Sequence, residues 1–213
     1  MKNIEYWEKI LKNPPNSYKK WFEKEKKYLQ KNITKNSKVL EVGCGEGRSL
    51  KDILPLTKNI TGIDYDKKAV NDAKKNFKDF PKIKILKADA HKLPFKNKSF
   101  DFVICMTTFA NFGNKKYIVL KEMNRVLKDK GFIIISVFSE DALKERMKVY
   151  KKHKVKIKKI NNGKVIFDKS EKMLDYISEQ FSKNELKKIF NKTNLKIIEI
   201  KKIGIAYICK LKK

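Results

Sequence analysis

Three glycines alternate in the segment VLEVGCGEG at 39–47, where Gly43, Gly45 and Gly47 follow an apolar stretch that predicts a strand. Glycine permits a tight turn between a strand and a helix, and its bare backbone lets a ligand approach closely. A dinucleotide fingerprint GxGxxG would require glycine at position 48, where the chain has Arg48, and no GKS or GKT sequence completes a phosphate-binding P-loop. The loop therefore argues against a dinucleotide or a nucleoside triphosphate.

Two carboxylates follow the next two predicted strands. Asp64 lies about twenty residues beyond Gly43, where a carboxylate accepts hydrogen bonds from both hydroxyls of a ribose. Asp89 stands where it can accept from an adenine amino group, and the backbone amide of Ala90 is available as a donor. Taken separately, the glycines could serve only a turn, Asp64 only a helix cap and Asp89 only a solvated loop. Their coincidence at three turns predicts a nucleoside site.

Short apolar stretches alternate with helical ones in the middle of the chain. The apolar stretches are KVLEVG at 38–43, NITGID at 59–64, KIKILKAD at 82–89, FDFVICM at 100–106 and GFIIISVF at 131–138. Helices are expected over 66–80 and 114–131, the second ending at Gly131 in a left-handed conformation. This alternation predicts a parallel sheet with helices on both faces.

The segments at the two ends differ from this pattern. Apolar residues recur at helical spacing over 17–31, and a shorter helix is expected around Tyr6 to Leu11. A helix near 182–191 precedes two strands, 195–203 and 206–211, that predict a closing antiparallel hairpin.

The predicted division of the chain is an N-terminal helical cap over residues 1–36 and one domain over 37–213. Within that domain the basic segment 139–172 is less regular, and it is interpreted as an insertion or lid with a short strand at 165–167.

Five segments occur in a characteristic order over residues 37–138: VLEVGCGEG, TGIDYD, ADAHKLPF, SFDFVICM and RVLKDKGFIIIS. Together they resemble the class I S-adenosylmethionine (SAM)-dependent methyltransferases, and the closing hairpin extends the likeness to the C-terminus. The resemblance implies an α/β fold with a Rossmann-like seven-stranded, mostly parallel sheet, a C-terminal antiparallel hairpin and an N-terminal helical extension. It also implies SAM as the cofactor. The implied cofactor-binding residues are Glu41, Gly43, Cys44, Gly45 and Gly47 near the methionine part, Asp64 at the ribose, Asp89 and Ala90 at the adenine, Met106 in the pocket wall, and also Tyr65.

SAM carries an activated methyl group, so the protein need not supply a nucleophile, and positioning and exclusion of water can provide much of the rate. Aromatic rings favour the positive sulfonium, which gives Tyr6, Trp7, Tyr18 and Trp21 a role as a covering lid, although most of that helix face is expected to pack internally.

Residues after the fourth strand face the acceptor in this architecture. They include Thr107, Thr108 and Asn111, and Arg48 is a further substrate or lid candidate. An acceptor hydroxyl would need a base, so their chemistry favours an amine or a thiol. No catalytic residue is assigned; His91 and His153 are weaker candidates for a base.

A net charge of +29 is the most unusual property of the composition, with 53 basic and 24 acidic residues. It would attract a polyanion such as RNA, but it consists almost entirely of lysine spread along the chain, which also fits a solvated surface. Isolated cysteines and only two histidines predict no metal site. The absence of an apolar leader or a long apolar run predicts a cytoplasmic protein with no membrane insertion.

The function predicted first is therefore methyl transfer to a small molecule or metabolite. An RNA methyltransferase acting on tRNA or rRNA is the alternative, with the lysines of 144–159 contacting phosphates. A protein methyltransferase and a non-catalytic SAM-binding protein are further alternatives. The acceptor, the methylated atom and the oligomeric state stay open at the level of sequence.

Overall fold

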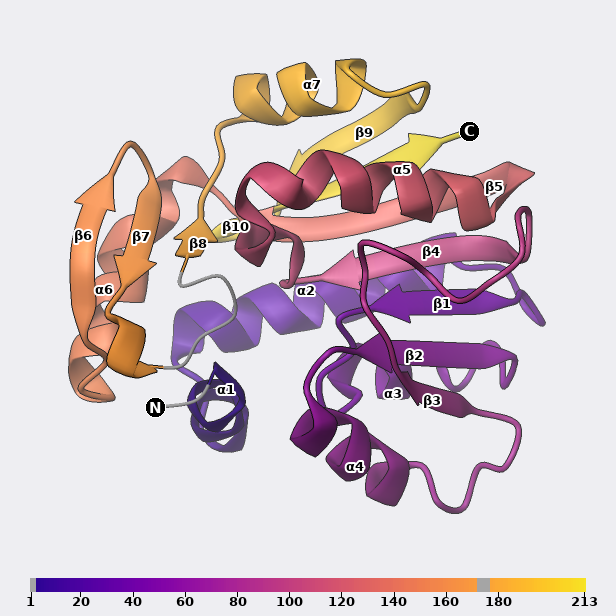
Figure 1. The fold of residues 1–213 in the computed structure, drawn as a ribbon, viewed down its shortest axis with the longest axis horizontal. Coiled ribbons are helices and arrows are strands. Elements are labelled where there is room, and N and C mark those ends of the chain that lie inside the picture. Colours follow the sequence, from indigo (N-terminus) through magenta and orange to yellow (C-terminus); the bar gives the residue numbers. More distant parts are fainter. Residues whose placement is uncertain (1–2, 172–176) are drawn as a thin grey trace.

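A seven-stranded sheet forms the centre of the computed structural model, which describes residues 3–171 and 177–213 (Figure 1). The strands are β1 (Val39–Val42), β2 (Ile60–Asp64), β3 (Lys84–Lys87), β4 (Phe100–Met106), β5 (Leu127–Phe138), β9 (Lys196–Lys202) and β10 (Ala206–Lys212). Their order is β3-β2-β1-β4-β5-β10-β9; the first five pair in parallel, and β10 is antiparallel to both β5 and β9. This topology confirms the predicted Rossmann-like fold with an antiparallel hairpin at its C-terminal end.

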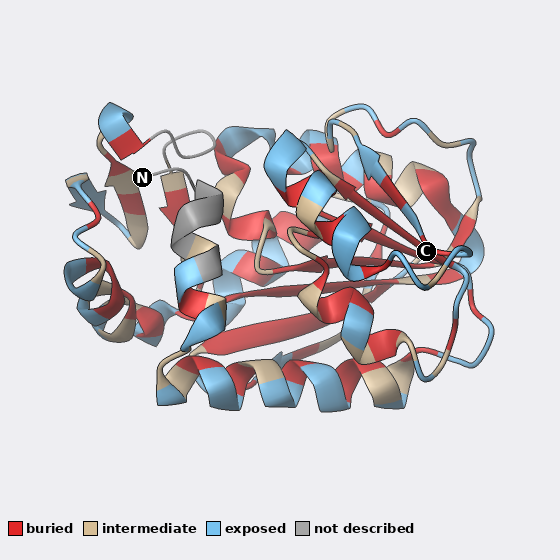
Figure 2. Cartoon of the chain, turned by 90° about the horizontal axis from the view of Figure 1, so that it is seen from below, coloured by how far each residue is buried: buried red, intermediate tan, exposed pale blue. Residues whose placement is uncertain are grey.

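Helices cover both faces of the sheet. They are α1 (Asn3–Lys12), α2 (Asn16–Asn32), α3 (Arg48–Ile53), α4 (Lys67–Asn76), α5 (Lys116–Val126) and α7 (Lys183–Asn191). One core cluster joins Leu29 of α2 and Leu50 of α3 to the sheet, and a second cluster joins Leu120 of α5 and Phe190 of α7 to its other face. Figure 2 shows the strands buried between helices whose outer sides are exposed. This layered arrangement is what the alternating sequence pattern predicts.

The helix predicted over 17–31 is confirmed by α2, which packs its apolar face against the sheet. Tyr18 and Trp21 are fully buried, and their rings lie 6.0 Å and 4.9 Å from the ring of Phe138. The indole nitrogen of Trp21 donates a hydrogen bond to the hydroxyl of Ser136 at 3.0 Å. Both aromatic side chains therefore fix α2 to β5.

The boundary between α5 and β5 differs from the prediction. The helix ends at Val126 and Gly131 lies inside β5, so the predicted helical ending at Gly131 is wrong. A Cβ at this position would lie 2.8 Å from the backbone oxygen of Asp101 on β4 and 2.7 Å from the side chain of Leu127. Gly131 is thus required for close approach of two strands and not for a left-handed turn.

A second, smaller sheet follows β5. It contains β6 (Ile157–Asn161), β7 (Lys164–Phe167) and β8 (Ile177–Glu179) in that order, all antiparallel, beside the helix α6 (Leu143–Lys152). The strand predicted at 165–167 is confirmed by β7, whereas α6 and β6 were not predicted. Short 3₁₀ helices connect these parts: η1 (Phe109–Asn111), η2 (Gly113–Lys115), η3 (Glu140–Ala142) and η4 (Lys169–Glu171).

The side-chain packing of this smaller unit is specific. The rings of Tyr150 on α6 and Phe167 on β7 lie 5.4 Å apart. Arg146 is fully buried and donates to the backbone oxygen of Ser178 on β8, to Gln180 and to the hydroxyl of Tyr150, each at 3.1 Å.

All three cysteines are buried and unpaired. None of the described helices has the length and apolar character needed to cross a bilayer.

Candidate functional site

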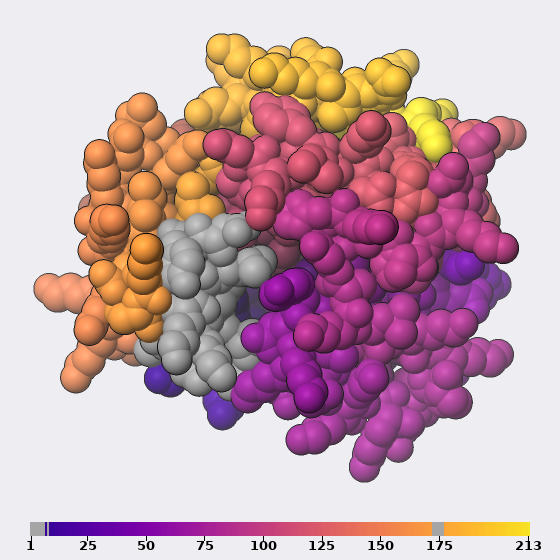
Figure 3. Space-filling view, in the orientation of Figure 1, coloured from indigo at the N-terminus to yellow at the C-terminus, as the bar shows by residue number. Residues whose placement is uncertain are grey.

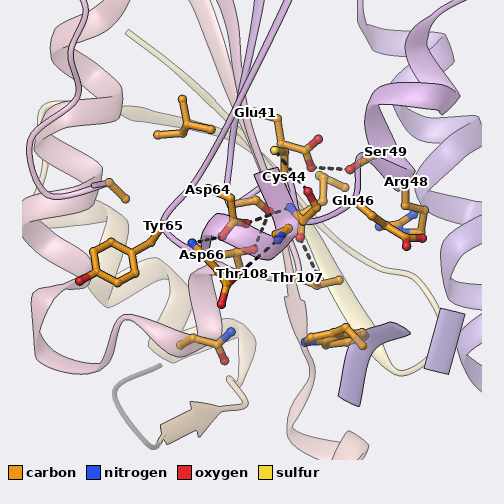
Figure 4. A pocket seen from close by; sticks show the side chains of 18 of the residues that line it. Glu41, Cys44, Glu46, Arg48, Ser49, Asp64, Tyr65, Asp66, Thr107 and Thr108 are labelled. Atoms are coloured by element: carbon orange, nitrogen blue, oxygen red, sulfur yellow. Dashed lines mark hydrogen bonds between the residues drawn. The ribbon is translucent and has the colours of Figure 1, made fainter. Parts of the chain in front are cut away.

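A cavity of about 560 Å³ opens at the carboxyl ends of β1, β2 and β4 (Figure 4). Ligand sites in open α/β sheets commonly lie at this edge, and the volume suits a ligand of nucleoside size or larger. The predicted site residues that line it are Trp7, Glu41, Gly43, Cys44, Gly45, Arg48, Asp64, Tyr65, Asp89, Ala90, Met106, Thr107, Thr108 and Asn111. The fold thus brings residues from five separate stretches of the chain into one wall.

The remaining predicted residues lie elsewhere. Gly47 precedes α3 with a φ of +91°, and a Cβ there would lie 2.3 Å from the ring of Phe77, so it serves the turn and the packing of the loop. Tyr18 and Trp21 are fully buried against β5, which places them in the core and not in the cavity wall. The side chain of Tyr6 lies outside the described residues.

The first glycine of the loop is held tightly to the segment after β4. Gly43 has a φ of +76°, and a Cβ there would lie 2.3 Å from the methyl carbon of Thr108. The hydroxyl of Thr108 donates to the backbone oxygen of Gly43 at 2.9 Å. Only glycine fits this position without displacing the threonine, so the first turn of the loop and the segment after β4 are held together.

Asp64 connects the glycine loop to the end of β2. Its carboxylate accepts from the backbone N–H of Gly45 at 2.9 Å and from that of Asp66 at 3.0 Å. Burial raises the pKa of Asp64, while these backbone hydrogen bonds oppose the shift. Figure 4 shows this carboxylate beside the loop, where its remaining lone pairs can accept from ligand hydroxyls.

Glu41 is the most deeply buried acid of the cavity wall, with 1% of its surface exposed. The hydroxyl of Ser49 donates to one of its carboxyl oxygens, and the other oxygen has no hydrogen-bond partner in the described part of the chain. Burial raises the pKa of Glu41 to about 8. An unsatisfied buried acid costs free energy, so this oxygen is positioned to receive a donor from a ligand, such as an ammonium group.

Asp89 and His91 form a pair at the other end of the cavity. Asp89 accepts from the His91 backbone N–H at 2.9 Å and lies 2.6 Å from the ring nitrogen Nδ1. Burial alone would raise the pKa of Asp89, but these interactions with His91 lower it overall. The ring of His91 packs edge-on against Phe112 with centroids 6.0 Å apart. The second carboxylate oxygen of Asp89 is left for an exocyclic amine.

Sequence reasoning missed how α2 contributes to this site. The Arg48 guanidinium lies 4.2 Å from the centre of the Phe22 ring, and both residues line the cavity. The same guanidinium contacts Glu25 at 2.6 Å, and Glu25 is fully buried. The sequence could have indicated that Glu25 is buried, because it lies four residues after Trp21 on the apolar face of α2. A charged residue at such a position indicates a buried partner.

Thr107, which lines the cavity just after β4, has a φ of +68°. A β-branched residue rarely adopts this left-handed conformation, and such strain gathers at functional sites. Its N–H donates to the backbone oxygen of Ser136 at 3.0 Å, and its hydroxyl bonds the backbone oxygen of Met106 at 2.6 Å. These bonds hold the start of the post-β4 segment.

The cavity residues fit SAM. Glu41 offers a free buried acceptor for an ammonium, Asp64 offers acceptors for ribose hydroxyls, and Asp89 offers one for an amino group. A Cβ at Gly45 would meet open space, which leaves bare backbone beside the ligand volume. Over the described ranges, no group of three or more His, Cys, Asp or Glu side chains could hold a metal ion.

Comparison with known proteins gives three relevant findings. Residues 40–135 match the model of a family described as "Methyltransferase domain". An uncharacterized protein of Methanocaldococcus jannaschii is 38% identical over 135 residues, which is 62% of this chain and half of that protein. A demethylmenaquinone methyltransferase of Staphylococcus aureus is 29% identical over 187 residues, covering 82% of this chain and 75% of that protein.

Structural similarity extends to nearly the whole chain. The Burkholderia thailandensis 1,6-didemethyltoxoflavin-N1-methyltransferase, solved with 1,6-didemethyltoxoflavin and S-adenosylhomocysteine, covers 99% of this chain and 86% of its own, with a TM-score of 0.72 at 12% identity. At that identity the similarity is one of fold.

Proposed function

Because the chain belongs to the class I SAM-dependent methyltransferase family, whose methyl donor is SAM, we propose that it transfers a methyl group to a small-molecule acceptor. The observation that carries this proposal is an apolar part of the cavity wall. There Trp7 and Leu11 of α1 and Phe22 of α2 line the same space as Thr107. An apolar wall of this kind suits a compact, partly aromatic acceptor.

Each end of the cavity has a proposed role in holding the cofactor. Ionised Glu41 binds the α-ammonium, Asp64 accepts from the ribose hydroxyls, and Asp89 and Ala90 bind the adenine edge. SAM supplies a methyl group already activated on a sulfonium. What this chain contributes is orientation of the acceptor and exclusion of water by Trp7 and its neighbours.

The acceptor is proposed to rest on the segment after β4. Thr108 and Asn111 provide a hydroxyl and an amide that can orient an acceptor nitrogen, sulfur or oxygen, and Phe112 provides an apolar surface. Residues 1–36 are proposed as the cap of this site and 139–172 as its basic lid. Both segments differ in composition from the central α/β part, as walls that select an acceptor would.

The relatives guide the choice of acceptors to test. One is named for demethylmenaquinone and a structurally similar one for 1,6-didemethyltoxoflavin, both ring compounds. A panel of quinols, fused heterocyclic amines and aromatic thiols is therefore the first set to examine.

The test is a methyl-transfer assay with radiolabelled SAM against this panel, with bulk tRNA, rRNA and a protein lysate as competing acceptors. Label transfer to a panel member, lost in Asp64→Ala but retained in the surface variant Lys196→Gln, would support the proposal. Transfer to RNA or protein alone would replace it with the corresponding macromolecular acceptor. Calorimetric binding of SAM with no transfer to any acceptor would favour a non-catalytic SAM-binding protein.

A further inference from the structure

Lysines occur along the whole chain, but positive charge is denser in one segment than in the chain as a whole. Residues 143–164 contain nine lysines and Arg146 against a single acid, Glu145, a net charge of +9 in a protein of net charge +29. About a tenth of the chain thus carries nearly a third of the charge excess. This segment forms α6, β6 and the turn into β7.

Most of these lysines are exposed on adjoining elements. We call the following set the basic face: Lys144, Lys148, Lys151 and Lys152 of α6, Lys154 and Lys156 of the connection, and Lys158, Lys159 and Ile160 of β6. The α6 lysines recur at spacings of three and four, so they share one side of the helix. Arg146 points the other way, into the core, where its guanidinium packs on the ring of Phe138.

The charge of the basic face is largely uncompensated. Lys148 pairs with Glu145 at 2.8 Å, but among the residues that the structure describes no carboxylate lies within ion-pair distance of its other lysines. Asp168 interacts electrostatically with Lys156 and Lys158, while its hydrogen bonds are made by Ser170. A surface of this kind gains from a partner that brings many negative charges at once.

An apolar residue stands at the tip of this charged surface. Ile160 is 41% exposed and lies near the end of the edge strand β6, directly after Lys158 and Lys159 and two residues before the turn at Asn162. An apolar tip flanked by lysines matches the boundary between lipid headgroups and acyl chains, where lysines meet phosphates and the apolar group enters the interface.

The same features fit a nucleic acid less well. The aromatic rings closest in sequence, Tyr150 and Phe167, are 3% and 4% exposed and cannot stack on bases. The only arginine of the segment, Arg146, is buried, so the planar group that best recognises phosphate is absent from the basic face.

We propose that the basic face docks the protein on an anionic lipid bilayer, with lysine ammonium groups against headgroup phosphates and Ile160 in the interface. The docking is peripheral, and it does not depend on the identity of the methyl acceptor. Figure 3 shows the segment in orange at the left margin of the molecule, with side chains extending from the body.

The basic face is also connected to the cavity wall. Glu145 of α6 accepts a hydrogen bond from Ser17, at the start of α2, at 3.1 Å. The same helix α2 carries Phe22, which lines the cavity together with Trp7 of α1. The helix that bears part of the basic face is therefore hydrogen-bonded to an element of the cavity wall.

The experiment is vesicle flotation of the full-length protein with vesicles of 70% phosphatidylcholine and 30% phosphatidylglycerol, and with vesicles of phosphatidylcholine alone. One variant replaces Lys151, Lys152, Lys158 and Lys159 with Gln, and a second is Ile160→Ser. The matched control replaces the exposed Lys183, Lys187, Lys188 and Lys196 with Gln, and its partner is Ile198→Ser, at an isoleucine that is 46% exposed on the edge strand β9. Circular dichroism verifies that each variant is folded.

The unaltered protein is expected to float with the anionic vesicles and not with the neutral ones, and binding should weaken between 50 mM and 500 mM salt. Neutralising four lysines of the basic face should lower the partition coefficient by at least about tenfold, since each lysine near an anionic surface contributes about 1 kcal/mol. Ile160→Ser should lower it severalfold, whereas the control variants should match the unaltered protein.

Three results would overturn the proposal. The first is no binding of the unaltered protein to anionic vesicles, and the second is an equal loss in the basic-face and control variants, which would indicate undirected charge attraction. The third is full binding by Ile160→Ser together with tighter, basic-face-dependent binding to bulk tRNA, which would assign the surface to RNA.

Discussion

Replacing Glu41 with Gln should make the stability of the ligand-free protein less dependent on pH. Burial raises the pKa of this carboxyl from its usual 4.5 to about 8. Between these values the native protein holds a proton that the unfolded chain has released. Because the native state binds more protons, the free energy of unfolding falls by about 1.4 kcal/mol for each pH unit in this interval.

The size of the effect follows from this slope. Between pH 5 and pH 7.5 the Glu41 carboxyl should remove about 3 kcal/mol of stability, while below the usual pKa it should remove none. Glutamine keeps an oxygen that accepts from Ser49, and its NH₂ takes the place of the oxygen that has no partner. The difference in unfolding free energy between Glu41→Gln and the unaltered protein should therefore grow by about 3 kcal/mol across this range.

Urea denaturation at pH 5, 6, 7 and 7.5 measures this difference, because most other titrating groups cancel between the two proteins. Glu23→Gln, at an exposed position of α2, is the control and should show no such growth. A difference that stayed constant from pH 5 to pH 7.5 would mean that Glu41 is ionised in the native protein, and the argument from burial would fail.

The same proton governs cofactor affinity. An ammonium beside Glu41 favours the ionised carboxylate, so SAM binding should release a proton and should tighten by up to about tenfold from pH 6 to pH 7, where an α-amino group stays protonated. Glu41→Gln should bind more weakly and lose this pH dependence, as calorimetry in two buffers of different ionisation enthalpy would detect.

Three further experiments test separate parts of the structure. Asp64→Ala should weaken SAM binding by about a hundredfold or more without unfolding the protein, because the carboxylate that would accept from the two ribose hydroxyls is lost. Calorimetry measures the affinity and circular dichroism the folding. Gly43→Ala should cost about 1–3 kcal/mol more stability in urea than Gly45→Ala, since the added methyl meets Thr108 at the first position and open space at the second; equal losses would contradict the close-contact argument. Arg146→Met should lower stability by about 2–4 kcal/mol and speed hydrogen exchange in β8, because it leaves the Ser178 oxygen unpaired; unchanged exchange would show that the arginine does not join α6 to the small sheet.

The centre of the sheet was predictable from sequence because its inner strands are buried on both faces. Strands such as β1 and β4 are then continuous apolar stretches, and turn residues mark their ends. The glycine loop and the carboxylates after β2 and β3 were predictable for the same reason, since each follows a recognisable strand end. Parallel strands bring those ends together at one edge of the sheet.

Other parts were hidden by their composition. The consecutive lysines of β6 interrupt the alternation of apolar and polar residues that would have predicted a strand. Gly131 is of a residue type that often ends a helix, but here it permits two strands to approach closely. Helical spacing indicates that Glu25 is buried, but its partner Arg48 lies 23 positions away, and no local pattern identifies that pairing. Sequence patterns report local periodicity, and these features arise from contacts that form only when the fold is complete.

Arg48 connects these observations. It was first notable because it stands where a dinucleotide loop would have glycine, and the structure supplies a physical reason for the difference. Its guanidinium pairs with the buried Glu25 at 2.6 Å, approaches Asp52 to 3.7 Å and favours the ionised form of Glu41. A glycine at this position would leave the Glu25 carboxyl buried without a counter-ion, which is strongly destabilising. The residue that separates this loop from dinucleotide-binding loops thus also ties α2, and with it the apolar wall containing Phe22, to the acid proposed to bind the cofactor.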